Sequence, residues 1–165
     1  MLKLKKKTPK ERSQTQEKTV AQEVSGVTVP ASGAIDTFKG DVRSDLFLIE
    51  CKTTEKDYYV LTFNTWSKIC GEALLDNMRE PLMQIDLNNG EKRLCVLNYD
   101  AFEDLIPQPD LDEAEWYNLS SRSVRLREIG IYVWKNYRNK KIIVVDWKYF
   151  LDVLLEKFDN SIIPF

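Results

Sequence analysis

The stretch GDVRSDLFLIECK, residues 40–52, decides how the first half of this chain folds. Its apolar run predicts a buried strand over residues 46–52, and the polar residues before that run predict a short turn after an earlier strand. Successive side chains of a strand point to opposite faces, so Glu50 and Lys52 share one face and Cys51 lies on the other. The sequence therefore places a carboxylate and an ammonium group side by side where the strand ends.

Strand and helix signals alternate on both sides of this stretch. Before it, Ser13 and Gln16 have the spacing of a capping box, and the helical segment that follows ends at Gly26. After it, an apolar stripe of helical spacing starts at Thr65. The other predicted elements are strands over residues 35–42, 58–63, 81–87 and 92–98, the last two joined by an NNG turn, and a short helix that starts at Asp100. Adjacent hairpins among interleaved helices predict an α/β fold with a central mixed β-sheet flanked by helices.

The last third of the chain is less regular. PQPDLDEAE, residues 107–115, separates it from the first part with two prolines and clustered acids. Beyond this segment, SVRLREIGIYVWKNY fits either a strand or a helix, IIVV predicts a strand, and Asp146 is placed to cap a final helix. The expected organisation is a basic flexible arm over residues 1–14, a core over residues 15–107, and a C-terminal extension over residues 108–165 packed on the same domain.

The composition limits the chemistry that is open to the protein. A chain of 165 residues with 43% hydrophobic residues is long enough for one well-cored domain. It contains no histidine, which excludes Ser-His-Asp and Cys-His triads and imidazole bases. Catalysis would therefore use carboxylates, lysines, hydroxyls or a hard metal ion bound through oxygen.

Cysteine use and the N-terminal residues predict a cytoplasmic protein. Cys51, Cys70 and Cys95 lie far apart, without the spacing of a zinc site and in an odd number. No apolar segment follows the N-terminal lysines, and no apolar run approaches the length of about 18 residues that a membrane helix needs. We therefore expect a reducing compartment and no membrane partner.

Acidic residues gather around the end of the strand that carries Glu50. Asp41 lies near the turn end of the preceding strand, where twist or a bulge could bring its carboxylate towards Glu50. Two facing carboxylates repel, and a hard divalent cation such as Mg²⁺, with Mn²⁺ as a substitute, removes that repulsion. Asp41, Glu50 and the carbonyl of Cys51 would hold the metal, and Lys52 would orient a water molecule or stabilise developing charge. Glu17, on the buried face of the first helix, is a fourth candidate.

A simpler interpretation competes with this one. The spacing Asp-x(n)-Glu-x-Lys arises by chance on the order of once in a chain of this size. Mixed charges at the end of a strand usually form a solvated edge. A nearer acid, Asp45, rivals Asp41, although its position suits the turn rather than the opposite strand. The context of the motif, with a hairpin turn before it and an acid on a buried helical face, is what favours a site.

The segment ASGAIDTFKGDVRSDLFLIECKTT, residues 31–54, resembles the core of PD-(D/E)xK nucleases, and within them the Holliday-junction-resolvase-like and phage-type endonucleases. The resemblance extends over about residues 15–98 as a pattern of elements and implies a restriction-endonuclease-like fold. It implies that Asp41 and Glu50 bind metal and that Lys52 assists catalysis. It also implies that Glu17 is the upstream acid and that Ser32 lies near the scissile phosphate. Gly40 stands where the family name has proline.

The resemblance implies a magnesium-dependent DNA endonuclease that hydrolyses phosphodiester bonds, and a Holliday junction or branched-DNA resolvase acting in DNA recombination is the leading expectation. Symmetric cleavage of a four-way junction requires two active sites, so a homodimer is expected. Such an enzyme would work in the cytoplasm of a bacterium, an archaeon or a phage-infected cell. The alternatives are a restriction-type or end-processing nuclease on linear duplex DNA, and a noncatalytic DNA-binding module with the same fold.

Basic residues are the expected DNA contacts. Lys5, Lys6 and Lys7 belong to the basic arm, whereas Arg43 and Lys56 lie near the motif. A second basic cluster in the last third of the chain consists of Ser121, Arg122, Ser123, Arg125 and Arg127. Solvated surface charge is the competing interpretation for each of these groups.

Overall fold

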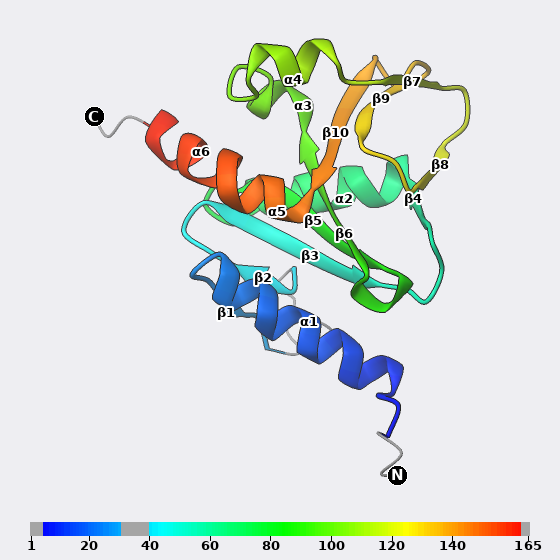
Figure 1. The fold of residues 1–165 in the computed structure, drawn as a ribbon. Coiled ribbons are helices and arrows are strands. Elements are labelled where there is room, and N and C mark those ends of the chain that lie inside the picture. Colours follow the sequence, from blue (N-terminus) through cyan, green and yellow to red (C-terminus); the bar gives the residue numbers. More distant parts are fainter. Residues whose placement is uncertain (1–4, 31–39, 163–165) are drawn as a thin grey trace.

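A computed structural model shows the fold of the protein and describes residues 5–30 and 40–162 (Figure 1). Ser32 and the greater part of the predicted strand over residues 35–42 lie outside the described residues. The described part is an α/β structure with a large mixed sheet flanked by helices, as the sequence predicts.

The first helix, α1, covers Pro9–Glu23 and begins earlier than predicted. The Thr8 hydroxyl accepts a hydrogen bond from the Glu11 N–H at 3.2 Å, and the Glu11 carboxylate accepts one from the Thr8 N–H at 2.7 Å. This reciprocal pair satisfies donors that a helix leaves open at its start. The capping box is therefore Thr8 with Glu11, not Ser13 with Gln16, and residues 9–14 of the predicted arm are helical.

Eight strands of the described residues form one sheet in the order β1-β2-β3-β5-β6-β10-β9-β7. The pairs β3–β5 and β7–β9 are parallel and the other neighbours are antiparallel, so the prediction of a mixed sheet is confirmed. The strands are β1 (Val27–Thr28), β2 (Val42–Arg43), β3 (Phe47–Thr53), β5 (Glu80–Leu87), β6 (Lys92–Asn98), β7 (Trp116–Leu119), β9 (Gly130–Trp134) and β10 (Lys140–Asp146).

The connections in the first half follow the sequence signals. Along the chain, helix α2 (Phe63–Leu75), capped by Thr62, lies between β3 and β5. These two strands are parallel neighbours in the sheet, and a parallel pair requires such a crossover connection. The predicted hairpin of β5 and β6 turns through η1 (Asn88–Gly90). All three residues of η1 have positive φ, the region that asparagine and glycine adopt most readily.

The last third of the chain continues the same sheet. β10 pairs with β6 on one side and with β9 on the other, and it contains the predicted IIVV strand. The ambiguous segment SVRLREIGIYVWKNY contains two strands, β8 (Ser123–Leu126) and β9. Asp146 caps the final helical segment as predicted, because its carboxylate accepts hydrogen bonds from the N–H groups of Lys148 and Tyr149. The remaining elements are α3 (Tyr99–Phe102), α4 (Gln108–Asp112), α5 (Trp147–Tyr149), η2 (Phe150–Leu154) and α6 (Leu155–Ser161).

The strand predicted over residues 58–63 does not join the central sheet. It forms β4 (Tyr59–Thr62), which pairs antiparallel with β8 in a separate two-stranded ribbon. Leu61 of β4 and Leu126 of β8 are fully buried, whereas Val60 is 46% exposed. The ribbon therefore has one face on the core and one face in solvent.

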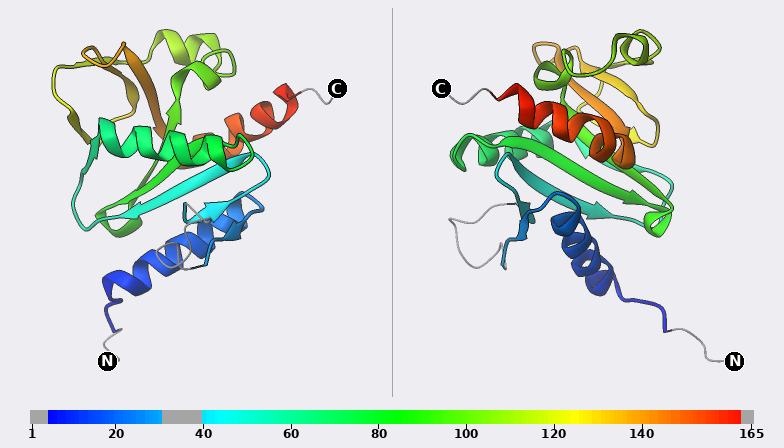
Figure 2. Two further views of the ribbon diagram at one scale, coloured as in Figure 1. Left: turned by 180° about the vertical axis from the view of Figure 1, so that it is seen from behind. Right: turned by 60° about the vertical axis from the view of Figure 1, so that its left-hand side comes forward.

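Helices cover both faces of the sheet (Figures 1 and 2). On one face α2 and the ribbon enclose a core that includes Trp66, Met83 and Trp134. On the other face α1 and the C-terminal helices enclose a second core that includes Val20, Phe47, Ile49, Cys51 and Trp147. Since Ile49 and Cys51 point into the α1 side, Glu50 and Lys52 point to the side that α2 covers.

No helix in the described residues is both long enough and apolar enough to span a lipid bilayer.

Candidate active site

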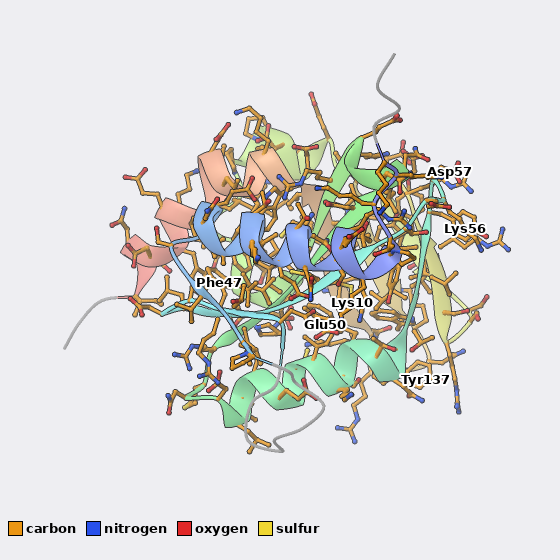
Figure 3. All side chains as sticks on the ribbon, turned by 90° about the horizontal axis from the view of Figure 1, so that it is seen from below. Lys10, Phe47, Glu50, Lys56, Asp57 and Tyr137 are labelled. Atoms are coloured by element: carbon orange, nitrogen blue, oxygen red, sulfur yellow. The ribbon has the colours of Figure 1, made fainter. Side chains whose placement is uncertain are left out.

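The candidate site lies where β2 stops covering β3. Val42 and Arg43 of β2 lie opposite Ile49 and Leu48, and the described residues place no further strand beside β3 on that side. Figure 3 looks at this edge of the sheet, with Glu50 visible between α1 and α2. The side chains of Lys52 and Glu50 near the end of β3 are partly exposed.

Glycine is required directly before Asp41. Gly40 has φ of +73°, and a Cβ atom there would lie 2.8 Å from Cδ1 of Leu48. Proline fixes φ near −65° and could not adopt this conformation. The departure from the PD-(D/E)xK pattern at this position therefore has a local backbone cause.

Asp41 is fixed against the edge of β3 by two hydrogen bonds. Its N–H donates to the Ile49 carbonyl at 2.9 Å, and its carboxylate Oδ2 accepts from the Cys51 N–H at 2.8 Å. In a strand the N–H and C=O of one residue point to the same side, so the Cys51 carbonyl faces the same edge. Asp41 and the Cys51 carbonyl are two of the three predicted metal ligands.

The carboxyl group of Asp41 is largely buried and has two acids and one cation near it. Burial raises its pKa to about 6, with further upward contributions from the charges of Glu50 and Glu17. The Cys51 N–H and the Lys52 ammonium act in the opposite direction. These contributions show that Asp41 lies close enough to Glu17, Glu50 and Lys52 for their charges to act on it.

Lys52 and Glu50 form an ion pair on the shared strand face. The Lys52 Nζ donates to Glu50 Oε1 at 2.8 Å, and the two side chains are 37% and 22% exposed. Burial alone would lower the pKa of Lys52, but the hydrogen bond and charge of Glu50, with smaller contributions from Tyr59 and Asp41, raise it above its usual value. Lys52 is therefore a cation at neutral pH and can donate protons in hydrogen bonds, not act as a base.

Helix α1 brings Glu17 and Gln16 to the site. Glu17 accepts a hydrogen bond from the Ser13 hydroxyl at 3.1 Å and lies near Asp41. Gln16 is buried and donates to the Lys52 carbonyl and to the side chain of Gln84, each at 2.7 Å. Gln16 thus fixes α1 to the strand that carries the site.

Two residues near the site were not among the predicted ones. Gln16 lies four positions before Val20, so the same count along the helix that selected Glu17 also selects Gln16. Tyr59, from the ribbon, lies near enough to Lys52 and Glu50 for their charges to act on its pKa, which burial raises. The alternation of β4 places Tyr59 on the same face as the buried Leu61, which is the signal that could have found it.

The donor atoms at the site suit a hard divalent cation. Carboxylate oxygens and a backbone carbonyl are the ligands that Mg²⁺ and Mn²⁺ prefer. The upward effect of Glu50 and Glu17 on the pKa of Asp41 reports an excess of negative charge that such a cation would relieve. Within residues 5–30 and 40–162, however, no three histidine, cysteine or acidic side chains are arranged so as to hold a metal ion. The structure therefore shows neighbouring acids and displays no formed metal site.

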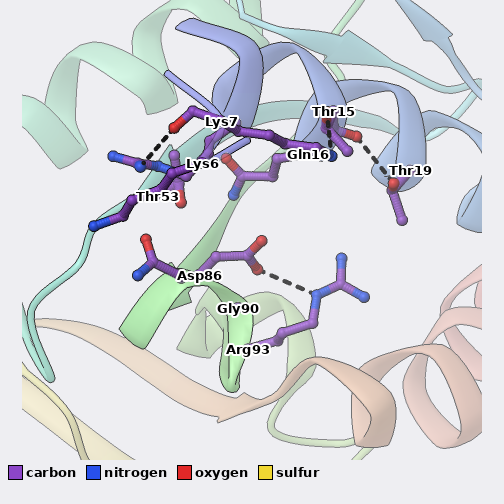
Figure 4. A pocket seen from close by; sticks show the side chains of 11 residues that line it. Lys6, Lys7, Thr15, Gln16, Thr19, Thr53, Asp86, Gly90 and Arg93 are labelled. Atoms are coloured by element: carbon purple, nitrogen blue, oxygen red, sulfur yellow. Dashed lines mark hydrogen bonds and ion pairs between the residues drawn. The ribbon is translucent and has the colours of Figure 1, made fainter. Parts of the chain in front are cut away.

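The basic arm lies beside α1, around a pocket of about 430 Å³ (Figure 4). Lys5, Lys6 and Lys7 are exposed, Lys6 lies 3.6 Å from Glu55, and Lys7 donates to the Thr15 hydroxyl. Gln16 also lines this pocket, so the pocket adjoins the helix that carries Glu17.

The other two predicted DNA contacts differ in their surroundings. Arg43 is held by Asp76, with Nε 2.8 Å from the carboxylate, and its side chain is 23% exposed. Lys56 is exposed, and its ammonium lies 5.4 Å from the centre of the Tyr58 ring. Of the two, Lys56 is the one that reaches into solvent.

Comparison of the chain with protein-family models and with curated proteins returns no match. The geometry of the candidate site and the sequence resemblance are therefore the grounds for proposing a function.

Proposed function

We propose that the protein is a metal-dependent DNA endonuclease of the restriction-endonuclease-like type, which hydrolyses phosphodiester bonds. The observation that carries the proposal is that Lys52 is paired with Glu50, and that Asp41 at the edge of the same strand lies near enough to Glu50, Lys52 and Glu17 of α1 for their charges to act on its pKa, which burial raises. The mixed sheet with helices on both faces is also the architecture that the sequence resemblance implies.

Each residue has a role that follows from its contacts. Asp41, fixed by the Cys51 N–H, would hold Mg²⁺ together with Glu50 and the Cys51 carbonyl. Magnesium, when bound, supplies Lewis-acid polarisation of the phosphoryl group and lowers the pKa of water. Lys52 is cationic and half-exposed, so it can donate a hydrogen bond to a water molecule or to a phosphate oxygen. Glu17 adds negative charge that favours retention of the cation.

Within this class we propose branched DNA, such as a Holliday junction, as the substrate. The support for this finer assignment is the resemblance of residues 31–54 to junction-resolving and phage-type endonucleases. Paired cleavage of a junction requires two sites, so the proposal includes a homodimer that works in the cytoplasm.

A cleavage assay with three substrates tests the proposal. A labelled four-way junction, a linear duplex of the same sequence and a supercoiled plasmid are each incubated with purified protein in Mg²⁺, in Mn²⁺ or in EDTA. Paired symmetric cuts in the junction that require the metal are expected, with little cutting of the plasmid. Degradation of all three substrates would support nuclease activity but contradict the proposed preference for junctions.

Two matched variants exclude a contaminating nuclease. Asp41→Asn removes one charge at the site, and Asp45→Asn removes one charge from the exposed turn between β2 and β3. Activity lost in the first variant and kept in the second assigns the cleavage to this site. Wild-type activity in both variants would show that the cleavage comes from another site or from a contaminating nuclease.

A noncatalytic DNA-binding module is the second candidate, because the described residues show no arrangement of three side chains that could hold a metal ion. Wild-type protein that binds DNA but cuts no substrate in either metal would favour this function over the nuclease.

A further inference from the structure

Three cationic side chains surround one aromatic ring where the chain enters the ribbon of β4 and β8. The charge centres of Arg125, Lys56 and Arg127 lie 4.9, 5.4 and 5.7 Å from the centre of the Tyr58 ring. The three side chains are exposed and the ring is partly exposed. Cations at such distances from a ring face are attracted to it, but they also repel one another.

Acidic side chains compensate little of this positive charge. Asp57 lies 3.7 Å from Arg127 and is itself 61% exposed. In the described part of the chain, Lys56 and Arg125 form no ion pair. The Lys92 ammonium, held by the Arg127 carbonyl, adds a further positive charge to the cluster. A group of like charges that is only partly compensated on an exposed surface favours a polyanionic partner.

The ribbon lies close to the candidate active site. Lys56 lies four positions after Lys52 along the chain, so their Cα atoms are at most about 14 Å apart. This span corresponds to roughly four base pairs of duplex at 3.4 Å each. Figure 3 labels Lys56 and Asp57 beyond the end of β3, and it labels Glu50 nearer the middle of the same view. A nucleic acid cut at the site would thus pass within reach of the ribbon.

Resting on the proposed function, we propose that Tyr58, Lys56, Arg125 and Arg127 form a nucleic-acid contact that binds the strand flanking the scissile phosphate. The cations neutralise backbone phosphates, and the ring offers a stacking surface to an unpaired base. Val60 opposite Arg125 is also exposed and continues this face of the ribbon. Of the polyanions, nucleic acid is favoured because the cluster combines phosphate-binding cations with an aromatic ring.

Binding in EDTA tests the contact without any cleavage. Fluorescence anisotropy of a labelled duplex and of a labelled single strand is measured over a series of salt concentrations. The triple variant Lys56→Gln, Arg125→Gln, Arg127→Gln is compared with the double variant Lys148→Gln, Lys157→Gln, whose exposed lysines lie on the C-terminal helices. We expect the triple variant to lose tenfold or more in affinity at about 0.1 M salt and to lower the salt slope by about 2 to 3.

The variant Tyr58→Leu removes the aromatic ring and keeps the three cations, so it measures the contribution of base stacking to binding. We expect it to weaken single-strand binding about tenfold and duplex binding much less, while Tyr58→Phe binds like wild type.

The outcomes distinguish the ribbon from the active site. Salt-dependent binding that the triple variant loses supports the contact even if no substrate is ever cut, whereas the absence of cutting refutes only the nuclease. Equal salt slopes for wild type and the triple variant would overturn the contact while leaving the nuclease intact. Binding to phosphatidylserine vesicles but not to DNA would also overturn it.

Discussion

Helix α1 presents two acids to the sheet, Glu17 and Glu23, and their surroundings are opposite. The carboxylate of Glu23 accepts two hydrogen bonds from Arg93, at 2.8 and 3.1 Å, and one from the Trp147 indole at 2.9 Å. Arg93 also lies 3.1 Å from Asp86. Around Glu23, then, fixed donors compensate the acids.

Among the residues that the structure describes, the acids around Glu17 outnumber the cations. Glu17 accepts one hydrogen bond from Ser13, and it acts with Glu50 to raise the pKa of Asp41. Lys52 is the cation of this group, and it is already paired with Glu50. Half-buried like charges destabilise a fold, so their persistence at an accessible edge is typical of a functional site. We therefore propose that the Glu23 cluster, which comprises Glu23, Arg93 and Asp86, maintains the structure. The Glu17 cluster, which comprises Glu17, Asp41, Glu50 and Lys52, is the one that we propose for a ligand.

The largest expected effect is the loss of cleavage in Lys52→Met. Removal of one preorganised donor to the reacting group should lower the rate by about 100- to 1000-fold. Arg93→Met is the matched control, because it removes a cation of the Glu23 cluster. Single-turnover rates of junction cleavage check both variants. An equal fall in the rate per folded molecule would contradict the proposed difference between the Glu17 and Glu23 clusters.

The free energy of unfolding should show the reverse order, with a larger loss in Arg93→Met than in Lys52→Met. Arg93→Met leaves Glu23 and Asp86 without their shared partner, and we expect a loss of about 2 kcal/mol in the free energy of unfolding. Lys52→Met should cost less than about 1 kcal/mol, because Lys52 makes one hydrogen bond to one partly exposed acid whereas Arg93 makes three to two acids. Urea unfolding at neutral pH measures both values, and a larger loss for Lys52→Met would refute the prediction.

A third effect concerns pH in the absence of metal. The pKa of Asp41 is raised from 3.8 to about 6 in the folded protein. Its contribution to stability is therefore fully present below about pH 4 and is lost as the pH rises through about 6. Solvent screening of the partly exposed carboxyl group limits the change to about 1 to 2 kcal/mol.

Asp41→Asn should remove this pH dependence and make the metal-free protein more stable than wild type at pH 7.5. Urea unfolding of both proteins at pH 4.5 and pH 7.5 checks the sign. A stability difference between the two proteins that does not change with pH would contradict it.

The smallest expected effect is stabilisation by Mg²⁺. At ten times its dissociation constant a bound ion adds about 1.4 kcal/mol, or roughly 4 °C in Tm for a domain of this size. Thermal unfolding of wild type should show this shift, and Asp41→Asn should not. Glu23→Gln, in the compensated cluster, should retain the shift.

The sequence predicts the relative positions of the candidate site residues better than it predicts which elements surround them. Alternation along β3 is enough to bring Glu50 and Lys52 together, and the turn before β3 is enough to return Asp41 to its edge. The hairpin of β5 and β6 and the cap at Asp146 depend on equally local signals.

The sequence does not predict features that depend on contacts between residues far apart along the chain. The pattern of residues 58–63 identifies a strand with one buried face, but nothing local shows that β4 pairs with β8 and not with the central sheet. Two capping signals compete near the start of α1, and Thr8 with Glu11 prevails over Ser13 with Gln16. Gln16 is then free to bind the Lys52 carbonyl.

The most direct test of the account is a crystal of the protein soaked in Mn²⁺ and measured at a wavelength where manganese scatters anomalously. The account predicts one strong anomalous peak within bonding distance of the carboxylates of Asp41 and Glu50. A map with no peak there, at a Mn²⁺ concentration that supports cleavage in solution, would contradict it.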